Sequence, residues 1–243
     1  MCRIFAVRSK RPLPVHSAFD GLRKLAAEHK DGWGVASFLP DAEPKIEWRV
    51  ETAEHCPRFL EIGQQSAQSM AVHIRLASVG TVHERNNHPF VAGPWVFMHN
   101  GTLKEFDAVR SQFEGELDAR LRAELRGETD SERCFALFRT YLGDRTASSD
   151  VADALVRTFR TAERICDSVN SPKKRSAMNF LVTDGTRFFC TRRDRTLFAA
   201  SNDTFAAIAS EQLALAHATW AEVPNDHLVT IDASLRLDVQ PIP

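Results

Sequence analysis

The sequence predicts an α+β fold, because strand patterns occupy both ends of the chain and helical patterns lie between them. Residues 2–8 form a nearly continuous apolar run, and residues 33–50 form a hairpin whose second strand alternates apolar and charged side chains. Four more strands are predicted near the C-terminal end, at 178–183, 186–192, 204–209 and 227–232. Strands from both ends can pack together, so one domain over residues 2–243 is predicted.

Helical periodicity fills the middle of the chain and one segment near its start. Ser17 and Thr102 are expected to cap two of these helices. Helices are predicted after Ser17, over 57–65, after Thr102, over 116–126, through 135–142 and over about 150–165, and further strands are expected at 69–75 and 95–98.

The connections carry the residues that favour turns and loops. A loop is expected at Pro12 and Pro14, a turn at Pro40-Asp41 and a hairpin turn at Asp184-Gly185. A long loop is predicted over 76–94, and a polar, basic loop over 170–176.

Composition narrows the classes of partner and location. The net charge of −1 leaves no electrostatic footprint for nucleic acid or an anionic membrane surface, so neither is a predicted partner. No apolar run approaches the roughly 20 residues of a membrane-spanning helix, and Arg8 and Lys10 interrupt the N-terminal run too early for a signal peptide. Five scattered cysteines without a C-x-x-C pair indicate a reducing compartment, and we expect a cytoplasmic protein.

Cys2 is the first candidate for chemistry, because loss of Met1 would give one residue both a thiol and a free α-amine. A nucleophile beside a base is the arrangement that covalent catalysis needs, and an α-amine has a reference pKa of about 7.7–8.0. The alternative is a small apolar residue that opens a strand.

Two later stretches end predicted strands with polar groups. His73-Ile74-Arg75 places a guanidinium where it could bind a carboxylate, or where it could simply be solvated. His99-Asn100-Gly101 offers an amide and a backbone N–H, the donors of an oxyanion hole, although Asn-Gly is equally a turn signal.

Two more stretches have an equally simple structural explanation. Asp130 or Ser131 could cap the helix that follows the polar loop 127–132. Residues 31–34, with the sequence D-G-W-G, could be a turn with a packed indole.

The order of these motifs resembles that of the class II (N-terminal nucleophile) glutamine amidotransferases, and most closely their small stand-alone, YafJ-type branch. The motifs cover the first 135 residues, and a weaker match continues through 178–185 and 209–213. In sequence order they are Cys2, D-G-W-G at 31–34, H-x-R at 73–75, N-H-P-F at 87–90, H-N-G at 99–101 and T-D-S-E at 129–132.

The resemblance implies a four-layer αββα sandwich of the N-terminal nucleophile hydrolase type, and a role for each motif residue. Cys2 would attack the γ-carboxamide of glutamine, and Asn100 and the Gly101 N–H would hold the oxyanion. Arg75 would bind the substrate α-carboxylate and Asp130 its α-ammonium. Ammonia would leave, and water would cleave the γ-glutamyl thioester to give glutamate.

One departure from the family pattern concerns the handling of ammonia. Many class II members have Trp after the motif arginine and His before the next glycine, whereas here Leu76 follows Arg75 and Val79 precedes Gly80. No synthase region is evident in the sequence, so a separate synthase or ligase subunit could receive the ammonia. No cofactor is predicted, and the chain could form a homodimer.

Two other functions stay open on the same residues. The small branch also resembles the γ-glutamyl hydrolase of ergothioneine assembly, so the substrate could be a larger γ-glutamyl conjugate. The pocket could instead belong to a non-catalytic binding scaffold. A metal site built from histidines 73, 83, 88 and 99 is not favoured, because loops separate them without ligand spacing, and the other cysteines are predicted to be packing thiols.

Overall fold

The computed structural model describes residues 2–39, 43–169 and 175–243. Met1, the predicted turn at Pro40-Asp41 and most of the predicted loop over 170–176 lie outside these ranges. No helix in the described part of the chain is long and apolar enough to cross a membrane.

The described strands form two antiparallel sheets. One consists of β1 (Arg3–Pro14), β2 (Trp33–Ser37), β3 (Lys45–Arg49), β4 (Ser66–Ile74), β9 (Phe198–Ser201), β10 (Phe205–Ala209) and β11 (Ala221–Glu222), in the order β11-β9-β10-β1-β4-β2-β3. The other consists of β5 (Phe90–Ala92), β6 (Trp95–Thr102), β7 (Ala177–Thr183), β8 (Phe188–Arg192), β12 (His227–Ile231) and β13 (Leu237–Pro241), in the order β13-β12-β8-β7-β6-β5.

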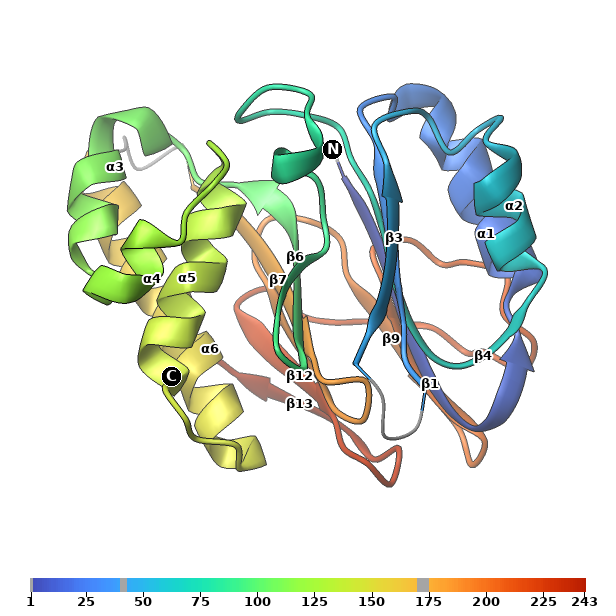
Figure 1. Ribbon diagram of the computed structural model, residues 1–243. Helices are drawn as coiled ribbons and strands as arrows, with labels where there is room; N and C mark the ends of the chain where they lie inside the picture. Colours follow the sequence, from blue (N-terminus) through green and yellow to red (C-terminus); the bar gives the residue numbers. More distant parts are fainter. Residues whose placement is uncertain (1, 40–42, 170–174) are drawn as a thin grey trace.

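Helices cover the outer face of each sheet, which gives four layers (Figure 1). The seven-stranded sheet carries α1 (His16–Leu25), followed by the short 3₁₀ helix η1 (Ala26–Glu28), and α2 (Pro57–Gly63). The six-stranded sheet carries α3 (Phe106–Gly115), α4 (Ala119–Ala123), α5 (Asp130–Leu142) and α6 (Ser148–Asp167). The predicted α+β class and the αββα sandwich are confirmed.

Strand β1 shows why the N-terminal run is apolar throughout. Phe5 and Val7 pack on α1 and α2, while Ile4 and Ala6 face the other sheet. Side chains alternate across a strand, so a strand buried on both faces needs apolar residues at every position.

Three predicted boundaries are wrong near N-caps and prolines. The expected loop at Pro12 and Pro14 is the end of β1. After a register shift this part of the strand pairs only with β4, so a proline, which has no backbone N–H, can turn toward the unpaired side. Ser17 caps nothing, because α1 begins at His16 after Val15. Thr102 is the last residue of β6, opposite Ala177, and α3 begins only at Phe106.

Several elements are shorter than predicted, or were not predicted. The charged segment 116–126 contains only α4, which Asp118 caps through its Oδ1 atom. The predicted loop 76–94 contains a 3₁₀ helix, η2 (Glu84–Asn86), and β5. Strands β9, β11 and β13 are also additional, since short strands depend on partners that a local pattern does not show.

Gly34, in β2, lies directly against the backbone of His88. A Cβ atom there would collide with the His88 carbonyl, so we expect Gly34→Ala to lower the free energy of unfolding by about 2–3 kcal/mol. Gly115→Ala is the matched control, because nothing lies within 4 Å of its Cβ position, and it should leave stability unchanged or raise it by up to about 1 kcal/mol. Urea unfolding measures both, and an equal midpoint for the two variants would contradict this packing.

Candidate active site

The predicted site residues come from strand ends that meet at one edge of the sandwich. Cys2 precedes β1 and lies on the same side of it as Ile4 and Ala6, between the two sheets. Arg3 pairs with Ile74, the last residue of β4. Cys2 therefore lies beside Arg75, the residue that follows β4. In Figure 1, β1 begins at this edge of the sandwich.

Four of the five predicted residues line one small cavity: Cys2, Arg75, Gly101 and Asp130. Its volume is about 20 Å³, which is room for a water molecule and too little for an amino acid. Asn100 does not line it. The segment 76–79 forms one wall, so the site is closed over Cys2 in this conformation.

The Cys2 thiol is buried, with 8% of the residue exposed, and among the described residues its hydrogen bonds are to the Leu76 backbone. The Leu76 N–H donates to Sγ over 3.4 Å, and the Leu76 carbonyl lies 3.5 Å from Sγ. Burial raises the pKa of the Cys2 thiol, although the Leu76 backbone opposes the shift. A thiol of raised pKa is protonated at neutral pH, so a reaction at Sγ needs a base.

Arg75 is a buried cation and not a solvated one, since only 3% of it is exposed. Its Nη2 donates to the carbonyls of Val79 and Thr81 over 3.4 and 3.3 Å. No described residue accepts a hydrogen bond from its buried Nη1. A guanidinium with an unused donor at a cavity wall can bind a carboxylate.

Asp130 is the first residue of α5, and the expectation that Asp130 or Ser131 caps this helix is wrong. Thr129 is the N-cap, and its hydroxyl accepts from the Glu132 N–H. The Asp130 Oδ2 accepts from the Leu103 N–H over 2.7 Å, and Oδ1 accepts from the Ser131 N–H over 2.8 Å. The carboxylate keeps lone pairs free and gains from the N-terminal end of the helix dipole.

His99 lines the cavity and supports its Asp130 end. Its Nε2 donates to the Ala177 carbonyl over 2.9 Å, which leaves Nδ1 to accept from the Ser131 hydroxyl at 3.0 Å. Burial lowers the pKa of His99, although the nearby Asp130 opposes the shift. The ring is therefore neutral and holds the Ser131 hydroxyl, while the Ser131 N–H donates to Asp130.

The Asn100-Gly101 pair is strand and not turn, because β6 pairs with β7 as far as Thr102. A Cβ at Gly101 would collide with the Ala177 carbonyl, so close strand packing explains this glycine. Asn100 faces the space between the sheets, as Met98 does, and among the described residues its buried Oδ1 has no hydrogen-bond partner.

The D-G-W-G stretch braces the segment after β4. Asp31 Oδ2 accepts from the Ala77 N–H over 2.7 Å, and the Gly32 carbonyl accepts from the Arg75 N–H over 2.8 Å. Gly32 has a φ of +136°, a value that L side chains rarely adopt. Trp33 is fully buried and packs edge-on against Phe59, so the packed indole is found together with a supporting role for Asp31.

Two further histidines, His73 and His88, are buried at the site, and His88 lines the cavity. The His73 and His88 rings stack with centroids 4.1 Å apart, and His73 Nε2 donates to the His99 carbonyl. Burial lowers the pKa of His73 to about 3 and that of His88 well below its usual range. No group of three or more His, Cys, Asp or Glu side chains in the described ranges is arranged to hold a metal ion.

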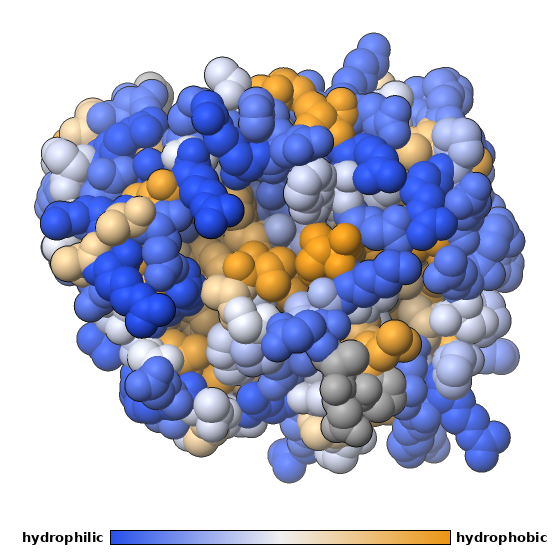
Figure 2. Space-filling model, viewed as in Figure 1, coloured by the Kyte–Doolittle hydropathy of each residue, from blue (hydrophilic) through white to orange (hydrophobic). Residues whose placement is uncertain are grey.

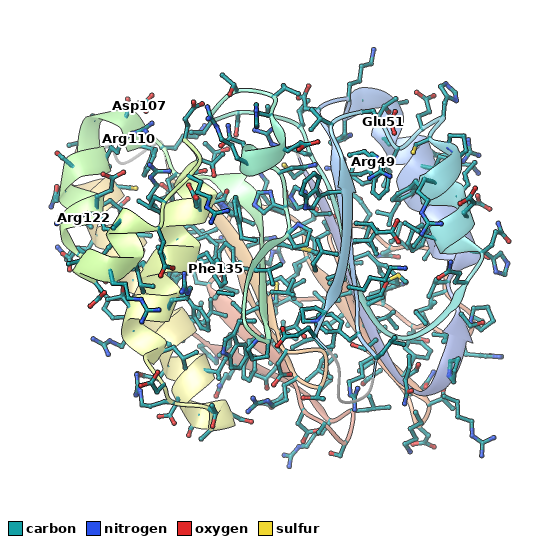
Figure 3. The ribbon with its side chains drawn as sticks, in the orientation of Figure 1. Arg49, Glu51, Asp107, Arg110, Arg122 and Phe135 are labelled. Carbon is teal, nitrogen blue, oxygen red and sulfur yellow. The ribbon has the colours of Figure 1, made fainter. Side chains whose placement is uncertain are left out.

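A wider groove of about 790 Å³ runs beside this site, between β3, β5 and the helices α4 and α5. Trp48, Phe90, Leu125 and Phe135 are among its apolar walls, and none of the five predicted residues lines it. Figure 2 shows apolar side chains in a hollow in the middle of this face, with polar side chains on both sides. Figure 3 labels Phe135, which extends from α5 toward the six-stranded sheet and stacks on Phe97.

Comparison with known proteins agrees with this geometry. The family model described as class II glutamine amidotransferases matches residues 1–205. The chain is 25% identical to the Saccharomyces cerevisiae "Probable glutamine amidotransferase DUG3", over 95% of this chain and 82% of that protein. It is 24% identical to the Escherichia coli protein YafJ, over 76% of this chain and 70% of YafJ.

A solved structure extends the comparison to the fold. A glutamine aminotransferase class-II domain protein of Silicibacter pomeroyi superposes with a TM-score of 0.74 at 22% identity, and all of both chains is covered. The chain belongs to the class II glutamine amidotransferases, and the predicted resemblance is confirmed.

Some contacts of the site are absent from the sequence prediction. The Leu76 backbone contact to Cys2 and the His99–Ser131 support of Asp130 depend on segments that only folding brings together. The motifs H-N-G and T-D-S-E contain these residues, but their spacing along the chain does not show the pairing.

The buried histidines make stability depend on pH. In the unfolded chain they bind protons below about pH 6.5, whereas folded His73 and His88 stay neutral to much lower pH, so stability falls as the pH drops from about 6.5 toward 3. Each contributes a slope of up to about 1.4 kcal/mol per pH unit. We expect His88→Leu to flatten the dependence by about one such contribution in urea unfolding between pH 4 and 8.

The control for this experiment is His16→Leu, which makes the same substitution at an exposed position and should keep the wild-type slope. A His88→Leu slope equal to that of the wild type would contradict the neutral, buried state of His88.

Proposed function

We propose that this protein hydrolyses a γ-glutamyl amide, in the simplest case glutamine to glutamate and ammonia, with Cys2 as the nucleophile. One observation carries this proposal. The same cavity is lined by Cys2, by Arg75, whose Nη1 donates no hydrogen bond to a described residue, and by Asp130, whose carboxylate keeps free lone pairs. A nucleophile combined with receptors for an α-carboxylate and an α-ammonium selects an amino-acid substrate.

The proposed base is the α-amine of Cys2, which exists only after Met1 is removed. The raised pKa of the Cys2 thiol makes such a base necessary, because little thiolate forms unaided. The amine takes the thiol proton as sulfur bonds to the γ-carbon. The same proton goes to the departing nitrogen as the C–N bond breaks, and ammonia leaves.

The second half of the reaction repeats these steps with water. The amine removes a proton from water, the water oxygen bonds to the thioester carbonyl, and the C–S bond breaks with return of the proton to sulfur. Glutamate leaves and the thiol is restored, so the amine and thiol end as they began.

The oxyanion of both tetrahedral states is assigned to the Asn100 side chain and the Gly101 N–H. Gly101 lines the cavity, and Asn100 lies buried directly before it, facing the same inter-sheet space as Cys2. Donors in a buried site stabilise developing charge strongly, and loss of one such donor typically lowers the rate by about 10²–10³.

The substrate head group is assigned to Arg75 and Asp130. Arg75 Nη1 has no hydrogen-bond partner among the described residues. Asp130 accepts from the backbone N–H groups of Leu103 and Ser131, one at each carboxylate oxygen, so each oxygen keeps a free lone pair. The cavity of about 20 Å³ must widen for a substrate to enter, so we propose that the wall at 76–79 moves aside. Residues 2–243 would act as one glutamine amidotransferase domain, since β1 and β10 pair across its length.

The nucleophile is tested with Cys2→Ala. Protein that has lost Met1 should release ammonia from glutamine, and Cys2→Ala should abolish this release while far-ultraviolet circular dichroism stays unchanged. Cys190→Ala is the matched control, because Cys190 is a fully buried thiol in the core between the sheets and should not affect turnover. Ammonia release that survives Cys2→Ala would refute the proposal. If the protein cleaves other γ-glutamyl compounds but not glutamine, the nucleophile stands and the assigned substrate is replaced by those compounds.

The head-group assignment is tested with Arg75→Lys. Lysine keeps the charge but not the planar fork, so we expect the KM for glutamine to rise by about tenfold or more with a smaller change in kcat. An unchanged KM in steady-state kinetics would remove Arg75 from the substrate site.

A further inference from the structure

One buried amide joins the two loops that carry Arg75 and Asp130. Asn86 lies in η2 with none of its surface exposed. Its Nδ2 donates to the Thr81 carbonyl over 3.0 Å, and its Oδ1 accepts from the Glu128 N–H over 2.8 Å. The side chain thus connects segments that are 47 residues apart in sequence.

Each of these two contacts involves a residue that lies next to the proposed head-group site, either through a shared hydrogen bond or along the chain. The Thr81 carbonyl that accepts from Asn86 also accepts from Arg75 Nη2. Glu128 lies two residues before Asp130, and Asp130 is the first residue of α5. The Asn86 amide therefore links the loop that holds the guanidinium to the loop that leads to the carboxylate.

Two glycines leave the space that this amide occupies. A Cβ at Gly80 would lie 3.1 Å from Asn86 Nδ2, and a Cβ at Gly127 would collide with Asn86 Oδ1. Gly80 also has a φ of +74°, which L side chains rarely adopt. The loops on both sides are thus shaped around Asn86.

A second contact reinforces the first from the solvent side. Glu128 Oε2 accepts from the Thr81 N–H and from its hydroxyl, both over 3.1 Å, and Oε1 accepts from Arg85 over 2.9 Å. This carboxylate is 39% exposed, so its hydrogen bonds are weaker contributors than those of the buried amide.

We propose that Asn86 is a positioning residue that holds Arg75 and Asp130 at the spacing of an α-amino acid, with Glu128 as its partly exposed support. This inference rests on the function proposed above. Asn86 touches no substrate and acts through Thr81 and Glu128. Its loss therefore weakens recognition of the head group and leaves the reactivity of the Cys2 thiol intact.

Asn86→Asp tests this directly. The aspartate keeps the oxygen that accepts from Glu128, but it places a second oxygen against the Thr81 carbonyl in place of a donor. A buried hydrogen bond to a charged network is worth about tenfold in affinity, so the KM for glutamine should rise by about tenfold with kcat within about twofold of the wild type.

Two alkylating probes separate positioning from general damage. A diazoketone analogue of glutamine carries the amino-acid head group, and at subsaturating concentration its reaction with Cys2 in Asn86→Asp should be about tenfold slower than in the wild type. Iodoacetamide lacks that head group and should alkylate Cys2 at the wild-type rate. Peptide mass mapping reports both rates at Cys2.

Asn202→Asp is the matched control, because the Asn202 amide also bridges two backbone segments but lies at the β9–β10 turn, beside Ser9 and Lys10 of β1 and away from Cys2. It should leave every readout unchanged. Glu128→Ala is the second variant if Asn86→Asp fails to fold, and it should change the same readouts in the same direction by a smaller factor.

Equal slowing of both probes, or wild-type values with both, would overturn the role of Asn86. If Asn86→Asp does not fold, wild-type KM and diazoketone rate in Glu128→Ala would overturn it as well. A wild-type protein whose Cys2 ignores the diazoketone would instead refute the proposed function, and the inference with it, so the two failures are distinguishable.

Discussion

The pairing of β1 with both β4 and β10 is the constraint on which the site depends. It makes the first strand of the chain an inner strand of the seven-stranded sheet, and so brings Cys2 between the sheets and not to a frayed end. Chain termini are usually mobile unless a sheet holds them. The proposed nucleophile at position 2 can face the proposed head-group receptor only because this strand is bonded on both sides.

The receptor itself consists of loops held by buried polar side chains. Asp31 holds the segment after β4, Asn86 joins it to the loop before α5, and His99 orients Ser131 against Asp130. Each bond is ordinary in strength, and together they replace the water that would otherwise solvate Arg75 and Asp130. Rigid strands and a bonded loop framework keep charged groups facing one small cavity.

The sequence predicted the parts of the fold that have a local cause. Alternating or continuous apolar runs located the long strands, and the order of motifs identified the family. The end of β6 was missed because Asn-Gly favours a turn locally, whereas pairing of Gly101 with Met178 keeps it in the strand. Asn86 was missed because its partners, Thr81 and Glu128, meet only in the folded chain. Roles that depend on such distant contacts require the structure.

Trapping a γ-glutamyl group on Cys2 during turnover is the most direct test of the proposed nucleophile. Protein without Met1 is mixed with isotopically labelled glutamine and quenched in acid within the first turnovers, and the masses of its cysteine-containing peptides are measured. We expect a labelled γ-glutamyl adduct on the Cys2 peptide and none on the peptides of the other four cysteines. Labelled glutamate formed without any adduct at Cys2, or with an adduct on another cysteine, would contradict that role of Cys2.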